Sequence, residues 1–147
     1  MEKKNELLDT ERKACFPLYV ASREMTKMYK PYLDKYDLTY TQYLSLIMLF
    51  DNVSLSVKDL GKKLCLDSGT LTPLLKKLEN KGYITRTRFA VDNRFLNVAL
   101  TEKGEELREE LTNIPQLVLD EIGITESESE ALNSLVSKLV KNVKTEE

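Results

Sequence analysis

The sequence of 147 residues predicts a mainly α-helical protein with a small β-wing (α+β): a winged helix-turn-helix whose N- and C-terminal helices form a dimerisation region. Apolar residues recur at helical spacing over most of the chain, and two short helical segments are joined by a tight turn that contains glycine. A hairpin pattern follows directly. The length favours a single domain, 1–147, with the terminal helices at about 1–50 and 102–147 and the winged element at about 53–101.

The N-terminal apolar pattern predicts one long helix over roughly 12–33. The residues that show the helical spacing are Phe16, Val20, Met28 and Tyr32. Pro17 suits a first helical turn, so the regular helix should begin shortly before it, which places Cys15 near a helix N-terminus. Pro31 falls in the interior, where proline kinks or breaks a helix.

Two further helices have clear start signals. Thr39 and Gln42 form a capping-box pair, and the apolar run after them predicts a buried helix that ends at 51–52. Ser56, with Asp59 three residues later, predicts a short third helix.

The next helix carries the pattern of a recognition helix. After the turn CLDSG it should begin around 68–70, because Pro73 is tolerated only near a first turn, and Gly82 supplies a left-handed stop. Its apolar stripe consists of Leu71, Leu74, Leu75 and Leu78. Two short helices joined in this way predict a helix-turn-helix.

The remainder predicts a wing and two more helices. The strand-like segments YITRTRFA and FLNVAL flank the polar turn VDNR, which indicates a β-hairpin. A helix should run from Thr101 to about Ile122, kinked or divided at Pro115. Thr125 and Glu128 then cap a last amphipathic helix.

Charge is distributed unevenly along the chain. Residues 58–94 include nine basic and four acidic side chains, whereas the rest of the chain holds 13 basic and 20 acidic ones. A basic segment inside an acidic protein is typical of a polyanion site, and a solvated surface is the plainer explanation.

Absent residue types exclude several chemistries. Without histidine there is no Ser-His-Asp or Cys-His pair and no His-bearing metal site, and two cysteines cannot build a four-thiolate zinc site. We therefore expect no metal, no cofactor and no enzyme. The polar start and the lack of a long apolar run predict no signal peptide and no membrane span, hence a cytoplasmic protein with reduced thiols.

Apolar stripes on the terminal helices need a partner surface. A homodimer is the simplest answer and suits a helix-turn-helix, since two-fold symmetry presents two recognition helices to adjacent major-groove faces. A monomer with the terminal helices folded onto its own core is the alternative.

Two blocks of sequence resemble MarR-type regulators. Their recognition helix and wing are similar to LCLDSGTLTPLLKKLENKGYITRTR followed by VDNRFLNVALTEKG. One branch, the organic-hydroperoxide-sensing repressors with their one-cysteine Gram-positive redox-regulator relatives, resembles the stretch ACFPLYVASREMTKMYKPYLDKYDLTYTQYL. The resemblance covers roughly 8–111.

This resemblance implies a redox sensor. Cys15 stands where these repressors have their peroxide-reactive cysteine, and Tyr29 and Tyr40 stand where tyrosines hydrogen-bond its sulfur. Fourteen residues of helix separate Cys15 from Tyr29 by about 21 Å, so Tyr29 would have to come from the other subunit. Tyr19, one helical turn from Cys15, could pack against the sulfur within the chain.

The resemblance also implies partners and a response. The reduced dimer would bind a pseudo-palindromic operator in double-stranded DNA, and peroxide or another oxidant would release it. No cysteine lies in the C-terminal helices, so a small thiol forming a mixed disulfide, or overoxidation, would replace a resolving cysteine. The residues expected to face DNA are Ser68, Thr70, Thr72, Lys76, Lys77, Arg86, Arg88, Asp92 and Arg94.

Other interpretations stay open. Cys15 could be an inert core thiol in a regulator released by a small lipophilic or phenolic ligand, or the nucleophile of a thiol peroxidase. A protein-interaction role without DNA is the plainest alternative. Ser68, Thr70 and Thr72 could merely cap a helix, and Cys65 is expected to be a small packing residue in its turn, with a secondary redox role as the alternative.

Overall fold

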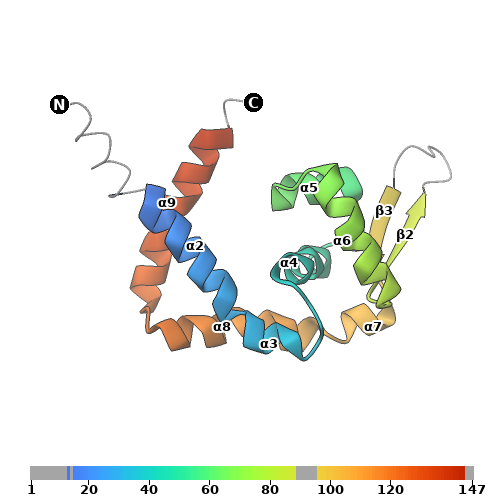
Figure 1. The fold of residues 1–147 in the computed structure, drawn as a ribbon, viewed down its shortest axis with the longest axis horizontal. Helices are drawn as coiled ribbons and strands as arrows, with labels where there is room; N and C mark the ends of the chain where they lie inside the picture. The colour runs from blue at the N-terminus through green and yellow to red at the C-terminus, as the bar shows by residue number, and fades with distance from the viewer. Residues whose placement is uncertain (1–12, 14, 89–95, 145–147) are drawn as a thin grey trace. The chain divides into compact units, whose positions relative to one another are not determined.

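The computed structural model describes residues 13, 15–88 and 96–144. The chain forms two compact units, Met1–Ile114 and Pro115–Glu147. The first contains a helix-turn-helix with a small sheet, and the second consists of helix (Figure 1). In the part of the chain that the structure describes, no helix has both the length and the apolar character needed to cross a membrane.

The N-terminal segment forms two helices, α2 (Phe16–Met28) and α3 (Lys30–Asp34). Pro17 lies in the first turn of α2 and Cys15 is its N-cap, as the sequence predicts. The helix predicted over 12–33 is interrupted at Tyr29, next to the interior proline that the sequence analysis named as a kink or break. Pro31 has no N–H and its ring clashes with the carbonyl four residues earlier, so it starts a new helix instead of continuing α2.

Helix α4 (Tyr40–Phe50) begins with the predicted capping box. The Gln42 amide N–H donates to Thr39 Oγ1 at 3.3 Å, and the Thr39 amide N–H donates to Gln42 Oε1 at 3.1 Å. Leu46 and Leu49 are fully buried, and even Ser45 is enclosed, with its hydroxyl bonded to the Thr41 carbonyl. This helix therefore forms the centre of the first unit.

The helix-turn-helix consists of α5 (Val57–Leu64) and α6 (Ser68–Asn80). Ser56 caps α5 by accepting from the Asp59 amide, as predicted. The predicted stripe of four leucines on α6 is buried, against α4 and α5 among other elements. Gly82 adopts φ +78 just after α6, the left-handed stop that the sequence indicates.

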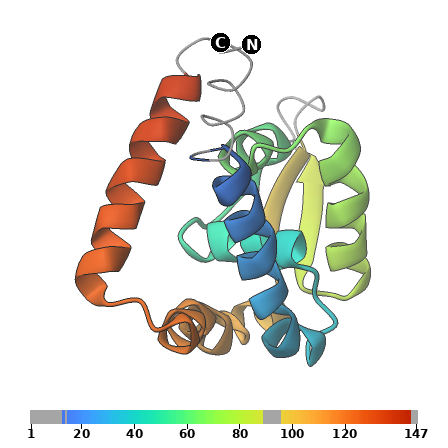
Figure 2. The ribbon, with the colours of Figure 1, turned by 60° about the vertical axis from the view of Figure 1, so that its left-hand side comes forward.

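A three-stranded antiparallel sheet follows, with the order β1 (Leu55–Ser56), β3 (Leu96–Leu100) and β2 (Ile84–Arg88). Strands β2 and β3 form the predicted hairpin, and β2 lies beside α6 (Figure 2). The turn of the hairpin is outside the described residues. Strand β1 was not predicted, because two residues are too short to show a period of two.

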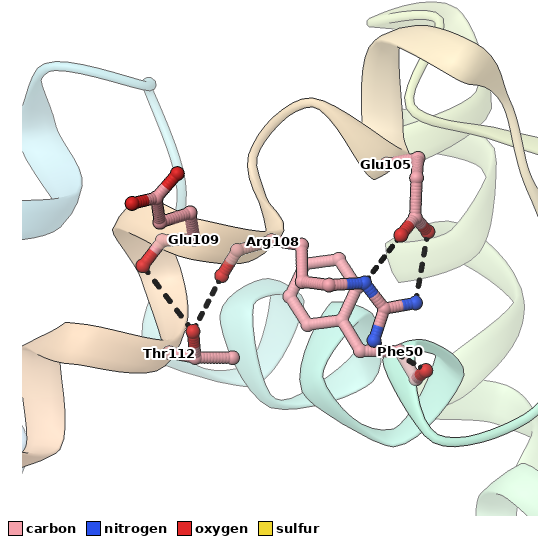
Figure 3. A network of polar contacts seen from close by, with 5 residues as sticks. All are labelled: Phe50, Glu105, Arg108, Glu109 and Thr112. Atoms are coloured by element: carbon pink, nitrogen blue, oxygen red, sulfur yellow. Dashed lines mark hydrogen bonds and ion pairs between the residues drawn. The ribbon is translucent and has the colours of Figure 1, made fainter.

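After the sheet, the chain forms α7 (Glu102–Glu105) and α8 (Arg108–Ile122). Of the two expectations for Pro115, a kink or a division, the division is wrong, since α8 continues through that residue and the break lies at 106–107. Next to this break, Arg108 donates to the Phe50 carbonyl at 2.6 Å and also to the Glu105 carboxylate (Figure 3). These bonds tie the start of α8 to the end of α4.

The second unit holds the last turns of α8 and the long helix α9 (Glu126–Lys144). Thr125 and Glu128 cap α9 as predicted: the Thr125 amide donates to Glu128 Oε2 at 2.9 Å, and the Glu128 amide donates to Thr125 Oγ1 at 3.3 Å. No residue of α9 is buried, so its apolar stripe lies open in the single chain.

Gly104 offers a test of how α7 docks on the sheet. A Cβ at this position would overlap the Tyr83 carbonyl oxygen, which is backbone and cannot rotate away. We expect Gly104→Ala to lower the free energy of unfolding by about 1–3 kcal/mol, measured by urea denaturation. Glu102→Ala, on the exposed side of the same helix, should cost much less; equal losses would show that the close packing at Gly104 is unimportant.

Candidate DNA-binding surface and thiol site

Helix α6 has one buried and one exposed face. The leucine stripe is buried, whereas Ser68, Thr72 and Lys76 are exposed and follow one another at helical spacing of four residues. A row of hydroxyls followed by a cation can donate to base edges and phosphates. The predicted recognition residues of α6 are thus at the surface and within reach of a ligand.

The N-terminus of α6 is capped by Asp67, which the sequence analysis did not single out. Its carboxylate accepts from the Thr70 amide at 2.8 Å and from the Thr70 hydroxyl at 3.1 Å. These hydrogen bonds, the amide one first, hold the pKa of Asp67 below its usual value. Thr70 is therefore engaged in the cap, and Asp67 was recognisable as an N-cap residue three positions before it.

A groove of about 600 Å³ lies between α6 and the helices that precede it in the chain. Lys77 and Lys81 of α6 line one part of it, and Lys27, Lys30 and Tyr40 line another. Lys77 therefore faces a cavity rich in lysine as well as solvent, so its charge can serve either DNA or a ligand in that groove.

The predicted wing residues differ in their surroundings. Arg88 is exposed at the end of β2, where a cation can reach a phosphate. Arg86 is instead bound to Glu79 of α6, with its Nη2 at 2.6 Å and its Nε at 3.0 Å from Glu79 Oε2. Asp92 and Arg94 lie outside the described residues.

Cys15 is a free, exposed thiol at the N-cap of α2. No residue of α2 is buried in the single chain. Tyr19 is 58% exposed, and its ring lies 5.8 Å from the Arg23 guanidinium carbon.

Tyr29 and Tyr40 lie together, and Tyr43 joins them. The ring centroids of Tyr29 and Tyr40 are 4.9 Å apart in an edge-to-face arrangement, and Tyr43 lies 5.5 Å from Tyr29 and 5.9 Å from Tyr40. Burial raises the pKa of all three phenols, most strongly for Tyr43, so they stay protonated and able to donate at neutral pH. Tyr43 could have been noticed from its place one helical turn after Tyr40.

The thiol and the tyrosines occupy opposite ends of α2. Cys15 is the N-cap and Tyr29 the C-cap of a regular 13-residue helix. At about 1.5 Å per residue they are roughly 21 Å apart along the axis, far beyond hydrogen-bond reach. Within one chain, Cys15 and the tyrosine cluster therefore cannot form one site.

The tyrosine cluster is linked to the recognition helix through a turn. Asp37, between α3 and α4, adopts the left-handed φ of 53. Lys81, the C-cap of α6, donates to the Asp37 carbonyl, and its Nζ lies 2.9 Å from the Asp37 carboxylate. A movement of this turn would therefore act directly on the end of α6.

Cys65 differs from its expected packing role. It is exposed, caps α5 at the left-handed φ of 54, and its sulfur lies 3.9 Å from the Lys62 carbonyl oxygen. Its left-handed backbone ends α5 and starts the turn that leads to α6. Among the described residues there is also no group of three metal-ligating side chains.

Comparison with known proteins places the chain among transcriptional regulators. The family model described as "Transcriptional regulator SarA/Rot" matches residues 27–111. The organic hydroperoxide resistance transcriptional regulator of Bacillus subtilis is 47% identical over 139 residues, 95% of this chain and 92% of that protein. SarZ of Staphylococcus saprophyticus, an HTH-type transcriptional regulator, is 47% identical over 142 residues, 94% and 96% of the two chains.

Solved structures agree with this placement. Reduced AbfR bound to DNA has a TM-score of 0.80 and 28% identity, and the match covers 97% of this chain and 99% of that one. Overoxidised AbfR bound to DNA has a TM-score of 0.78 at 28% identity, over 95% and 98% of the two chains. AbfR is a protein of Staphylococcus epidermidis.

The tyrosine cluster predicts sensitivity to alkali. Unfolded tyrosines ionise near pH 10, whereas the folded pKa values are raised, so the folded chain holds more protons and loses stability as pH rises past about 10. We expect Tyr43→Phe to make the decline in unfolding free energy between about pH 8 and pH 11 shallower, measured by urea denaturation.

Tyr19→Phe is the matched control, because Tyr19 is exposed and should leave that decline unchanged. Parallel declines for wild type and Tyr43→Phe would contradict the assignment of raised pKa values to the cluster.

Proposed function

The chain belongs to the MarR-type family of transcriptional regulators, as a relative of the SarA/Rot proteins, and from this membership we propose that it is a repressor that releases its operator when a hydroperoxide oxidises Cys15. The observation that carries the proposal is the free, exposed Cys15 thiol at the N-terminus of α2 in a chain whose recognition helix presents an open polar face. Such a protein acts in the cytoplasm, where the operator DNA is.

DNA binding is supported by the polar face of α6. A recognition helix enters the major groove with its N-terminal residues near the base edges, which is where Ser68 and Thr72 are exposed. Lys76 lies one turn further along, at a position suited to a phosphate. Arg88 would contact the backbone or the minor groove beside it, as would Asp92 and Arg94, which lie outside the described residues.

A homodimer is supported by exposed apolar side chains. On α2, Phe16 is 57% and Tyr19 58% exposed, and on α9, Leu135 is 69% and Val143 67% exposed. Apolar faces of this extent are buried in a stable protein, and a second copy of the same chain supplies the matching surface. Two recognition helices would then read a pseudo-palindromic operator.

The dimer also supplies the thiol with its hydrogen-bond donors. Since Cys15 cannot reach the tyrosines of its own chain, Tyr29 and Tyr40 would serve the thiol of the other subunit. The raised pKa values of these phenols favour the protonated form, which can donate to a thiolate. Tyr19 would cover the sulfur from within its own chain.

The proposed chemistry is a two-electron oxidation. The Cys15 thiolate attacks the outer oxygen of a hydroperoxide, the O–O bond breaks, and the alkoxide leaves and takes a proton to become an alcohol. Cys15 becomes a sulfenic acid, which condenses with a small thiol to a mixed disulfide and water or is oxidised further. The added bulk breaks the tyrosine hydrogen bonds and shifts the turn that Lys81 holds.

Replacement of the thiol tests the sensor. We expect Cys15→Ser to bind the protein's own upstream DNA as tightly as wild type when reduced, and to stay bound after one equivalent of an organic hydroperoxide that releases wild type. Fluorescence anisotropy measures the release, and intact mass identifies the oxidised residue. Cys65→Ser is the matched control and should be released like wild type.

Release of Cys15→Ser by the hydroperoxide would refute the sensor. Release of Cys15→Ser by a small aromatic acid, without any peroxide, would instead favour a ligand in the lysine-lined groove as the natural signal.

The role of Lys76 is tested by salt. If Lys76 neutralises a phosphate, Lys76→Ala should weaken binding to every duplex and reduce the slope of log affinity against log salt by about 1 per protomer. Lys138→Ala removes the same charge from α9, outside the winged element, and should leave the slope unchanged. Identical slopes for wild type and Lys76→Ala would remove Lys76 from the interface.

A further inference from the structure

The two faces of strand β2 hold different kinds of side chain. Residues along a strand alternate between faces, so Ile84, Arg86 and Arg88 share one face and Thr85 and Thr87 the other. Ile84 is buried, and Arg86 pairs across the sheet with Val98, which is fully buried. Arg86 therefore extends from the same face of the sheet as Ile84 and Val98, where it meets Glu79 of α6.

On this face, Glu79 of α6 holds Arg86 at three points. Its Oε1 accepts from the Arg86 amide at 3.2 Å, and its Oε2 accepts from Nε at 3.0 Å and from Nη2 at 2.6 Å. The Glu79 side chain is 33% exposed and the Arg86 side chain 18% exposed. Water therefore competes less for these hydrogen bonds than it does for those of a fully exposed ion pair. A single carboxylate thus binds both the backbone and the side chain of the strand.

The Glu79–Arg86 pair lies where α6 and β2 meet, so it can fix the angle between this helix and this strand. Helix α6 and strand β2 are joined only by residues 81–83, with Gly82 in the left-handed region. Several hydrogen bonds hold this turn. Among them, the Thr101 hydroxyl donates to the Gly82 carbonyl at 2.6 Å, and the Tyr83 amide donates to the Leu78 carbonyl at 3.1 Å. The Glu79 contact acts further out along the strand, so it resists a swing of the wing against the helix.

The charge of Arg86 is also compensated. Its hydrogen bonds keep the pKa of Glu79 below the ordinary value, so the carboxylate stays ionised and neutralises the guanidinium. A cation in this state adds little to the attraction of a phosphate, unlike the exposed Arg88 two residues later.

We propose that Glu79 and Arg86 are a positioning pair that sets the angle between the recognition helix and the wing, so that both reach their DNA grooves in one docking step. The proposal rests on the DNA-binding function proposed above. It moves Arg86 from the expected DNA contacts to a residue that acts through α6 and the wing, and it adds Glu79, which carries the wrong charge for a phosphate contact.

The test is a double-mutant cycle on binding to the upstream duplex. Removing either partner leaves the other half-buried and unpaired, so Glu79→Gln and Arg86→Gln should each weaken specific binding by roughly ten-fold, and the double variant no more than either one. The salt slope should match that of wild type in all three. Arg88→Gln should lower the slope by about 1 per protomer, and Glu102→Gln, which removes an exposed carboxylate from α7, should leave specific binding unchanged.

Opposite results would identify a phosphate contact. In that case Glu79→Gln would tighten binding by freeing the guanidinium and Arg86→Gln would lower the salt slope. The gain from Glu79→Gln would disappear in the double variant, because no guanidinium is left to free. Arg86→Lys separates the two roles further, because lysine keeps the charge but not the planar fork. Weak DNA binding by Arg86→Lys supports the positioning role of the pair, and near wild-type binding overturns that role.

Two controls keep the outcomes distinct. Thermal unfolding and a stoichiometric titration of each variant give the folded, binding-competent fraction, to which affinities are referred. If wild type itself fails to bind the duplex, the proposed function falls and the pair's role with it. If wild type binds and the variants are additive, only the positioning pair is overturned.

Discussion

Burial of α4 on almost every side is the constraint on which the rest of the first unit depends. Its residues contact α3, α5, α6 and β3, and its central side chains, such as Leu46 and Leu49, have essentially no exposed surface. Close-packed interiors resist small shifts and respond by moving whole elements. A helix held in this way behaves as a rigid element, and the segments bonded to its two ends move together with it.

The two ends of α4 hold the two features that the proposed function must couple. At the N-terminal end, Tyr40 and Tyr43 form the cluster with Tyr29, and the turn before it is bonded to Lys81 of α6. At the C-terminal end, the Phe50 carbonyl accepts from Arg108 at the start of α8. A change at the tyrosines can therefore reach the recognition helix through the Asp37 turn, and the helices that follow the wing through Arg108.

Sequence alone predicted the elements whose signals are local. The capping pairs at Thr39 and Thr125, the leucine stripe of α6 and the stop at Gly82 involve residues a few positions apart, and each was confirmed. The exact places where the helices break, at Tyr29 and at 106–107, depend on tertiary packing, because the sequence offers several prolines and turn residues at which a break could occur. The pairing of Glu79 with Arg86 depends on the register of β2 beside α6, which no local pattern encodes.

The geometry of α2 explains why a sensor of this kind would need two chains. A helix of 13 residues separates the thiol at one end from the phenols at the other, and none of its side chains is buried. In a two-fold arrangement that pairs α2 with α2 in antiparallel fashion, each Cys15 would meet the partner's tyrosines, and the site would form twice. Oxidation would then weaken contacts between subunits directly, because the sensing bond and the dimer contact would be the same interaction. A thiol that bonded within its own chain would have no such direct influence on the spacing of the two recognition helices.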